Sequence, residues 1–367
     1  MAAEVKFQAL LNSTLMNGNQ DVLKHWIEQQ VNTKDKNQQT ALHKATRDGH
    51  LNTVKYLIQI GAQVNVKDEI NEFTPLHIAG MKGHLEIVQC LIDLGAQIDA
   101  KEAPTGQTPL IHAVVDGHLD VVKCLINNGA QIDAEDSDSC TPLHFAAESG
   151  FLEIARYLID QGANIDARDN NEMTPLHSAV NGGHLEVVKF LCESKAQIDS
   201  REITDDTPLH IATQNGFLEI VKFLVEKGAQ LDTKTNDGDT PVHIAAHHGH
   251  LEIVKLLVEK GAQIELINHN NETPFYIANR ESHKEIAKYL LEKKREAENQ
   301  NPKENFSNKD PCIICLEPRN SLFVLNPCGH MSLCEACSYN LIQQDHPKCP
   351  TCRKQVRDYT KVFYQAP

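Results

Sequence analysis

The sequence of 367 residues predicts an all-α solenoid built from short helical repeats, followed by a second, small domain. The first observation is a motif, Thr-Pro-Leu-His or a close variant, that returns at intervals of 33 or 34 residues. The second is that seven of the eleven cysteines crowd between Cys312 and Cys352. In a reducing compartment such crowding indicates a metal site rather than disulfides, so the small domain is predicted to be metal-stabilised.

Each repeat reads as a helix, a turn, a second helix and a hairpin loop. Proline follows the motif's threonine at the first helical position, where its missing N–H costs nothing, and the threonine can cap that helix. In the second helix, for example Glu252 to Val258, apolar residues recur at three- and four-residue spacing and form a stripe for packing. The motifs begin at Thr40, Thr74, Thr108, Thr141, Thr174, Thr207, Thr240 and Thr273.

These motifs resemble the ankyrin repeat, and the resemblance runs from about Phe7 to Lys294. It implies about nine stacked repeats, of which Phe7 to Val31 is an N-terminal capping repeat. Two departures predict local irregularities. Ile111-His112 inverts the usual His-Ile order, so this repeat is expected to lose or reroute a hydrogen bond. Lys195 replaces a helix-ending glycine and is expected to be strained by about 1 kcal/mol if its φ is positive.

The formal charge is 35 minus 50, or -15, which argues against nucleic acid or an anionic membrane as the main partner. The N-terminus mixes charged and apolar residues, and no apolar run approaches 18 residues, so neither export nor membrane insertion is expected. A cytoplasmic protein is predicted. The basic run Lys293-Lys294-Arg295 is too short to decide nuclear entry, which stays open.

The sequence predicts a repeat domain over 1–297, a polar linker over 298–308 and a zinc module over 309–367. The module holds eight potential ligands in four close pairs, enough for two tetrahedral zinc ions. They are Cys312, Cys315, Cys328, His330, Cys334, Cys337, Cys349 and Cys352. With all positions filled by protein, zinc is expected to be a scaffold without an open catalytic position.

Histidine is the fourth of these ligands, and this order resembles the RING finger, a small α+β domain. The resemblance implies one zinc ion on Cys312, Cys315, Cys334 and Cys337 and another on Cys328, His330, Cys349 and Cys352. It further implies that Ile314, Leu341 and Pro350 contact a ubiquitin-conjugating enzyme. Arg353 stands where many active RING domains carry a cation that bridges this enzyme and ubiquitin.

The tail from Gln355 to Tyr364 resembles the C-terminal strand of RING domains in inhibitor-of-apoptosis, Mind bomb and p53-directed ligases. RING domains of inhibitor-of-apoptosis and p53-directed ligases dimerise, and an aromatic residue eleven places beyond the last ligand reaches across to ubiquitin. Phe363 falls at that place. The resemblance therefore adds a RING homodimer to the candidate partners.

Together these resemblances predict a RING-type E3 ubiquitin ligase that binds a protein substrate on the concave face of the repeats. Transfer would need no covalent ligase intermediate, because the ligase only orients the charged conjugating enzyme. The alternative is a non-catalytic scaffold that its RING dimerises. Candidate substrate contacts stand just before the turns between paired helices: Arg47, Lys82, Asp116, Glu148, Gln214 and His247. The identity of the substrate is not encoded in these motifs.

Overall fold

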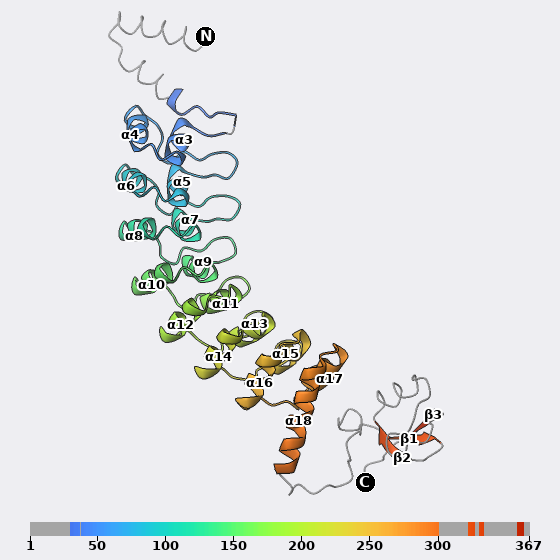
Figure 1. The fold of residues 1–367 in the computed structure, drawn as a ribbon. Helices are drawn as coiled ribbons and strands as arrows, with labels where there is room; N and C mark the ends of the chain where they lie inside the picture. Colours follow the sequence, from blue (N-terminus) through green and yellow to red (C-terminus); the bar gives the residue numbers. More distant parts are fainter. Residues whose placement is uncertain (1–29, 37, 301–321, 327–329, 334–357, 363–367) are drawn as a thin grey trace, which may run out of the picture. The chain divides into compact units, whose positions relative to one another are not determined.

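The computed structural model describes residues 30–36, 38–300, 322–326, 330–333 and 358–362. The chain divides into two compact units, Met1–Asn236 and Asp237–Pro367. Helices α3 to α14 belong to the first unit, and α15 to α18 and three strands belong to the second (Figure 1). None of the helices in the described ranges is both long and apolar enough to cross a membrane.

The described helices alternate between a first and a second helix of each repeat. The first helices carry odd numbers: α3 (Ala41–Arg47), α5 (Pro75–Lys82), α7 (Pro109–Val115), α9 (Pro142–Glu148), α11 (Pro175–Asn181), α13 (Pro208–Gln214), α15 (Pro241–His248) and α17 (Pro274–Arg280). The second helices carry even numbers: α4 (Leu51–Gln59), α6 (Leu85–Asp93), α8 (Leu119–Asn127), α10 (Leu152–Asp160), α12 (Leu185–Glu193), α14 (Leu218–Glu226), α16 (Leu251–Glu259) and α18 (Lys284–Gln300). The all-α repeat solenoid is thereby confirmed.

Within the first unit each odd helix packs on the next odd helix and each even helix on the next even one (Figure 1). The leucine of the Thr-Pro-Leu-His motif supplies the shared core, since Leu110, Leu143 and Leu176 are fully buried. The even helices add a buried stripe, such as Ile154, Ala155 and Leu158 of α10. Because every repeat contributes the same residues, the core continues from one repeat to its neighbour.

The motif histidine links each helix cap to the next repeat. In α9 the backbone N–H of Thr141 donates to Nδ1 of His144, and Nε2 lies 3.0 Å from the carbonyl oxygen of Met173. Since Nδ1 accepts and a carbonyl only accepts, Nε2 must carry the single proton of a neutral imidazole. The same pattern recurs in α3, α5, α11, α13 and α15 at His43, His77, His177, His210 and His243.

A second set of histidines bridges the turns between paired helices. Nε2 of His84 lies 3.1 Å from the carbonyl oxygen of Arg47, and that of His184 lies 2.8 Å from the carbonyl oxygen of Glu148. The turn between α9 and α10 contains Gly150, whose φ is 75°. A Cβ atom added at this glycine would lie only 2.4 Å from Nδ1 of His184, so the turn requires glycine. Both sets of histidines thus have structural roles as bridges between repeats.

The hairpin loops are joined by a ladder of side-chain acceptors. Oδ1 of Asp99 accepts the backbone N–H of Gln131 at 2.9 Å, and Oδ1 of Asp166 accepts that of Gln197 at 2.9 Å. Equivalent bonds run from Asn32, Asn65, Asp133 and Asp199 to the following repeat. An aspartate or asparagine in each of these hairpin loops therefore links it to the next loop.

The repeat with inverted order loses the histidine bridge, as predicted. Ile111 occupies the buried third position of α7, and Thr108 Oγ1 accepts only the backbone N–H of Ile111 at 3.3 Å. His112 instead packs edge-on against Phe73 and His77, with ring centroids 5.2 and 5.7 Å away. Its Nε2 is buried without a hydrogen-bond partner among the described residues.

Lys195 adopts the left-handed conformation that the missing glycine predicts, with φ at 73°. Glycines take this place after α10 and α14, where Gly162 and Gly228 have φ of 96° and 95°. A residue with a Cβ is strained in this region of backbone space, so the end of α12 is a local weak point.

Three short strands of the second unit form a sheet of order β2-β1-β3. Their bounds are β1 (Leu322–Asn326), β2 (His330–Leu333) and β3 (Asp358–Val362). Both pairings are antiparallel, with Leu325 opposite His330 on β2 and Val324 opposite Thr360 on β3. The strand predicted in the C-terminal tail is thus present, and it closes the sheet beside β1.

Replacing Lys195 with glycine should raise the free energy of unfolding by about 1 kcal/mol, because the left-handed conformation no longer strains a Cβ. Gly162→Ala is the matched control: a Cβ there would meet nothing within 4 Å, so only backbone strain is added and stability should fall by a similar amount. Urea unfolding followed by circular dichroism measures both. A Lys195→Gly midpoint at or below wild type would contradict the strain.

Lowering the pH should destabilise the array through its buried motif histidines. Burial lowers the pKa of His177 from 6.5 to about 4, partly opposed by the bond to the carbonyl of Asp206. Below pH 6.5 the unfolded chain binds the proton and the folded chain does not, so stability is complete above pH 6.5 and falls toward pH 4. Between pH 7 and pH 5 this histidine should account for a loss of about 2 kcal/mol.

The test compares urea midpoints of the wild type and His177→Gln at both pH values. The variant should be less stable at pH 7 but show a smaller loss on acidification. His250→Gln, at a half-buried turn position, serves as the control for removing one histidine. Equal losses in the wild type and His177→Gln would show that this imidazole is not the linked group.

Candidate substrate surface and zinc module

The six predicted substrate contacts lie at or next to the C-terminal ends of odd helices. Arg47, Lys82, Glu148 and Gln214 are the last residues of their helices, Asp116 directly follows α7, and His247 is the penultimate residue of α15. All six side chains are exposed. In the first unit they therefore form a row beside the turns, and the row changes from basic at Arg47 and Lys82 to acidic at Asp116 and Glu148.

In the second unit the end of α15 faces a charged group at the end of α17. Nδ1 of His247 lies 3.8 Å from Oε1 of Glu281, and this carboxylate also accepts from Nε of Arg280 at 2.9 Å. The Arg280 guanidinium beside Glu281 holds the pKa of that carboxyl below its usual range. Among the described residues no group of three or more histidines, cysteines or carboxylates is arranged to hold a metal ion.

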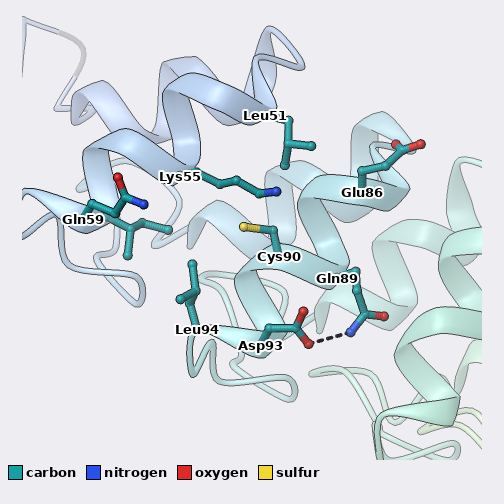
Figure 2. A pocket seen from close by; sticks show the side chains of 9 residues that line it. Leu51, Lys55, Gln59, Glu86, Gln89, Cys90, Asp93 and Leu94 are labelled. Carbon is teal, nitrogen blue, oxygen red and sulfur yellow. Dashed lines mark hydrogen bonds between the residues drawn. The ribbon is translucent and has the colours of Figure 1, made fainter.

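Two grooves lie between even helices, away from the predicted row. The larger, of about 690 Å³, separates α4 from α6 and is lined by Leu51, Lys55, Ile58, Gln59, Glu86, Gln89, Cys90, Asp93 and Leu94 (Figure 2). A second, of about 460 Å³, separates α6 from α8. The repeat motifs did not predict these grooves. One feature of the sequence does mark the grooves. The sixth residue of an even helix is the large Tyr157 in α10, but it is a small cysteine in α6 (Cys90) and in α8 (Cys124).

The four cysteines of the repeats are poor nucleophiles. Burial raises the pKa of Cys90 and Cys124, and it raises that of Cys192 to about 11. The pKa of Cys140 rises to about 12, first through burial and then through the carboxylates of Asp136 and Asp169. The thiolate is the reactive form, so none of these described cysteines is prepared for covalent catalysis.

Most predicted zinc ligands lie outside the described residues: Cys312, Cys315, Cys328, Cys334, Cys337, Cys349 and Cys352. The same is true of Ile314, Leu341, Pro350, Arg353 and Phe363. His330 is the first residue of β2, opposite Leu325. A strand rises about 3.3 Å per residue, so β2 spans about 10 Å from His330 to Leu333.

The donor set suits zinc. Thiolate sulfur and imidazole nitrogen are the ligands that zinc prefers in closed structural sites, and eight of them fill two tetrahedra.

Comparison with known families assigns both parts of the chain. Ankyrin repeats, described as three copies, match residues 11–102, 97–169, 162–235 and 230–303. The chain belongs to the ankyrin-repeat family. A zinc finger of C3HC4 type, the RING finger, matches residues 308–359. The ankyrin array is thus followed by a RING finger, as the two resemblances predicted.

Several curated proteins resemble a part of this ankyrin and RING chain. Apoptosis inhibitor 1 of Autographa californica nuclear polyhedrosis virus is 39% identical over 71 residues, 19% of this chain and 23% of that protein. E3 ubiquitin-protein ligase SP1 of Arabidopsis thaliana is 41% identical over 70 residues, 19% of this chain and 18% of that protein. E3 ubiquitin-protein ligase NEURL1B of Mus musculus is 32% identical over 62 residues, 17% and 11% of the two chains. Each likeness spans less than a quarter of these relatives.

The purified protein should contain two zinc ions, measurable by native mass spectrometry. Cys349→Ser should lower the content because it removes one tetrahedral ligand, whereas Cys140→Ser, in a hairpin loop of the array, should keep both ions. Chelation should unfold the RING finger, since metal binding contributes on the order of 10 kcal/mol to such modules, and leave the helical circular dichroism of the array. A wild-type content of one ion would contradict the two-site prediction.

Proposed function

We propose that this protein is a RING-type E3 ubiquitin ligase whose ankyrin array binds the substrate. The observation that carries the proposal is the RING finger at residues 308–359, found in a chain that resembles two proteins named E3 ubiquitin-protein ligases. Zinc, when bound by the seven cysteines and His330, would supply a rigid scaffold for the module. The proposed partners are a ubiquitin-conjugating enzyme, ubiquitin and a protein substrate.

In this mechanism the chain positions reactants and forms no covalent intermediate. Ile314, Leu341 and Pro350 would form the apolar contact to the conjugating enzyme, and Arg353 would hold the enzyme and ubiquitin in the reactive orientation through its planar guanidinium. Fixing two reactants in this way can lower a barrier by several kcal/mol. The raised pKa values of the described cysteines support a mechanism without a cysteine nucleophile.

The substrate would bind along the exposed row at the ends of the odd helices. Arg47 and Lys82 offer a basic end to this row, and Asp116 and Glu148 follow as an acidic segment. A substrate with acidic groups followed by basic groups would match this order. Substrate lysines near the RING finger would accept ubiquitin, in a reaction that we assign to the cytoplasm. Phe363 would contribute if two RING fingers pair.

The test is a reconstituted ubiquitination assay with the zinc-loaded full chain and a panel of conjugating enzymes. Ubiquitin chains should form with the wild type. Ile314→Ala should lower the rate at least about 5-fold, because an anchor contact at an interface is worth more than 1 kcal/mol. Arg353→Ala should lower it as well, whereas Arg357→Ala, a nearby arginine without an assigned role, should not.

Zinc content and helical circular dichroism of each variant establish that the fold is intact. The ligase assignment would be wrong if the folded wild type stays inactive with the whole panel. If that protein also forms dimers, the non-catalytic scaffold becomes the better assignment.

A further inference from the structure

The space between successive even helices is filled in the middle of the array by an aromatic ring under a cation. Between α8 and α10, Nζ of Lys123 lies 5.7 Å from the centre of the Tyr157 ring. Between α10 and α12, the guanidinium carbon of Arg156 lies 4.6 Å from the centre of the Phe190 ring. In both places the cation is the fifth residue of one helix and the ring is the sixth residue of the next.

The groove between α4 and α6 has the cation of this pair but not the ring. Lys55 is the fifth residue of α4, equivalent to Lys123 and Arg156, and the sixth residue of α6 is Cys90. Figure 2 shows the Lys55 ammonium pointing toward Cys90, and its charge acts on that thiol. Cysteine is much smaller than tyrosine or phenylalanine. The groove of about 690 Å³ includes the place that the ring occupies in the later repeats.

The walls of this groove suit an apolar side chain. Leu51 and Ile58 of α4 line the groove together with Cys90, and Leu94, which follows α6, is 46% exposed. Later repeats carry polar residues at the place of Leu94, for example Asn128 and Gln161. An apolar groove with polar residues at its rim is typical of protein-binding surfaces.

We propose that the groove between α4 and α6 is a second protein-docking site, which takes a phenylalanine or tyrosine side chain of a partner segment beneath Lys55. The incoming ring would occupy the place that Tyr157 and Phe190 fill within the array. The cation attracts the negative face of the ring, and the leucine and isoleucine walls bury its edge. The site is separate from the row at the ends of the odd helices, and it does not depend on ubiquitin transfer.

The charges around the groove define the rest of the partner. Glu86 and Asp93 of α6 stand at its rim opposite Lys55, and Asp93 accepts a hydrogen bond from Gln89 at 2.8 Å. Two carboxylates against one ammonium leave a net negative charge. A partner with a basic residue beside its aromatic residue is therefore complementary.

The neighbouring groove between α6 and α8 lacks both parts of the pair. Gln89 stands at the place of the cation and Cys124 at the place of the ring. The Gln89 carbonyl accepts from the Cys124 thiol at 3.3 Å and from the Asn128 amide at 3.4 Å. Gln89, at the place of the cation, carries no charge that would attract a ring, so the proposal is confined to the groove of Lys55.

The probe is a tripeptide, acetyl-Lys-(4-fluorophenylalanine)-Lys-amide, titrated into the zinc-loaded full chain and followed by fluorine NMR and by the methyl signals of Leu51, Ile58 and Leu94. We expect these methyl signals to shift. A peptide with leucine in place of the fluorinated ring should bind more weakly. Lys55→Met should weaken binding about 3-fold, the typical effect of an exposed cation–π contact. Lys222→Met, at the fifth residue of α14, is the matched control and should leave the affinity for the peptide unchanged.

Cys90→Phe should abolish peptide binding, since the array's own ring then fills the groove, and should leave self-ubiquitination at the wild-type level. If this variant fails to fold, Leu94→Lys serves in its place, because it removes an exposed wall and repels the basic peptide. Binding that persists unchanged in the folded variant, or shifts confined to methyl groups elsewhere, would overturn the proposal. Absence of peptide binding to the wild type would overturn it too.

Discussion

The hydrogen bond from a neutral motif histidine to the carbonyl of the following repeat is the interaction on which the array depends. It satisfies the cap of one helix and a buried carbonyl of the next repeat with a single imidazole. Protonation would place a second N–H against the threonine backbone, so burial and the hydrogen-bond pattern favour the same neutral form. The spacing of the motif, and hence of the exposed side chains, follows from this bridge.

The sequence predicted the repeats because each structural demand is tied to one residue type. Proline marks the helix start, the motif leucine is buried, and the positive φ of Lys195 was expected from the missing glycine. The lost bridge at Ile111 and His112 followed from residue order alone. The assignment of the RING finger rested on ligand spacing, which is equally specific.

The grooves could not be predicted from the motifs because they depend on the absence of a large side chain between two helices. Cys90 is an ordinary core residue within its own helix. Its small size matters because Lys55 of the preceding repeat lines the same groove and has no aromatic ring beneath it. Similarly, exposure of the row from Arg47 to His247 required knowing where each helix ends. Such properties belong to pairs of repeats rather than to a motif. Pattern matching treats each repeat alone and therefore cannot reveal them.

The strained joint at Lys195 has a mechanical meaning. In a stack where each repeat contacts only its neighbours, tension travels through every interface in turn, and failure begins where local stability is lowest. Lys195, which follows α12 in the left-handed conformation, lies between two repeats whose second helices are followed by a glycine at this place. A protein-unfolding motor that pulls on this array would therefore meet less resistance at the end of α12 than at the ends of α10 and α14.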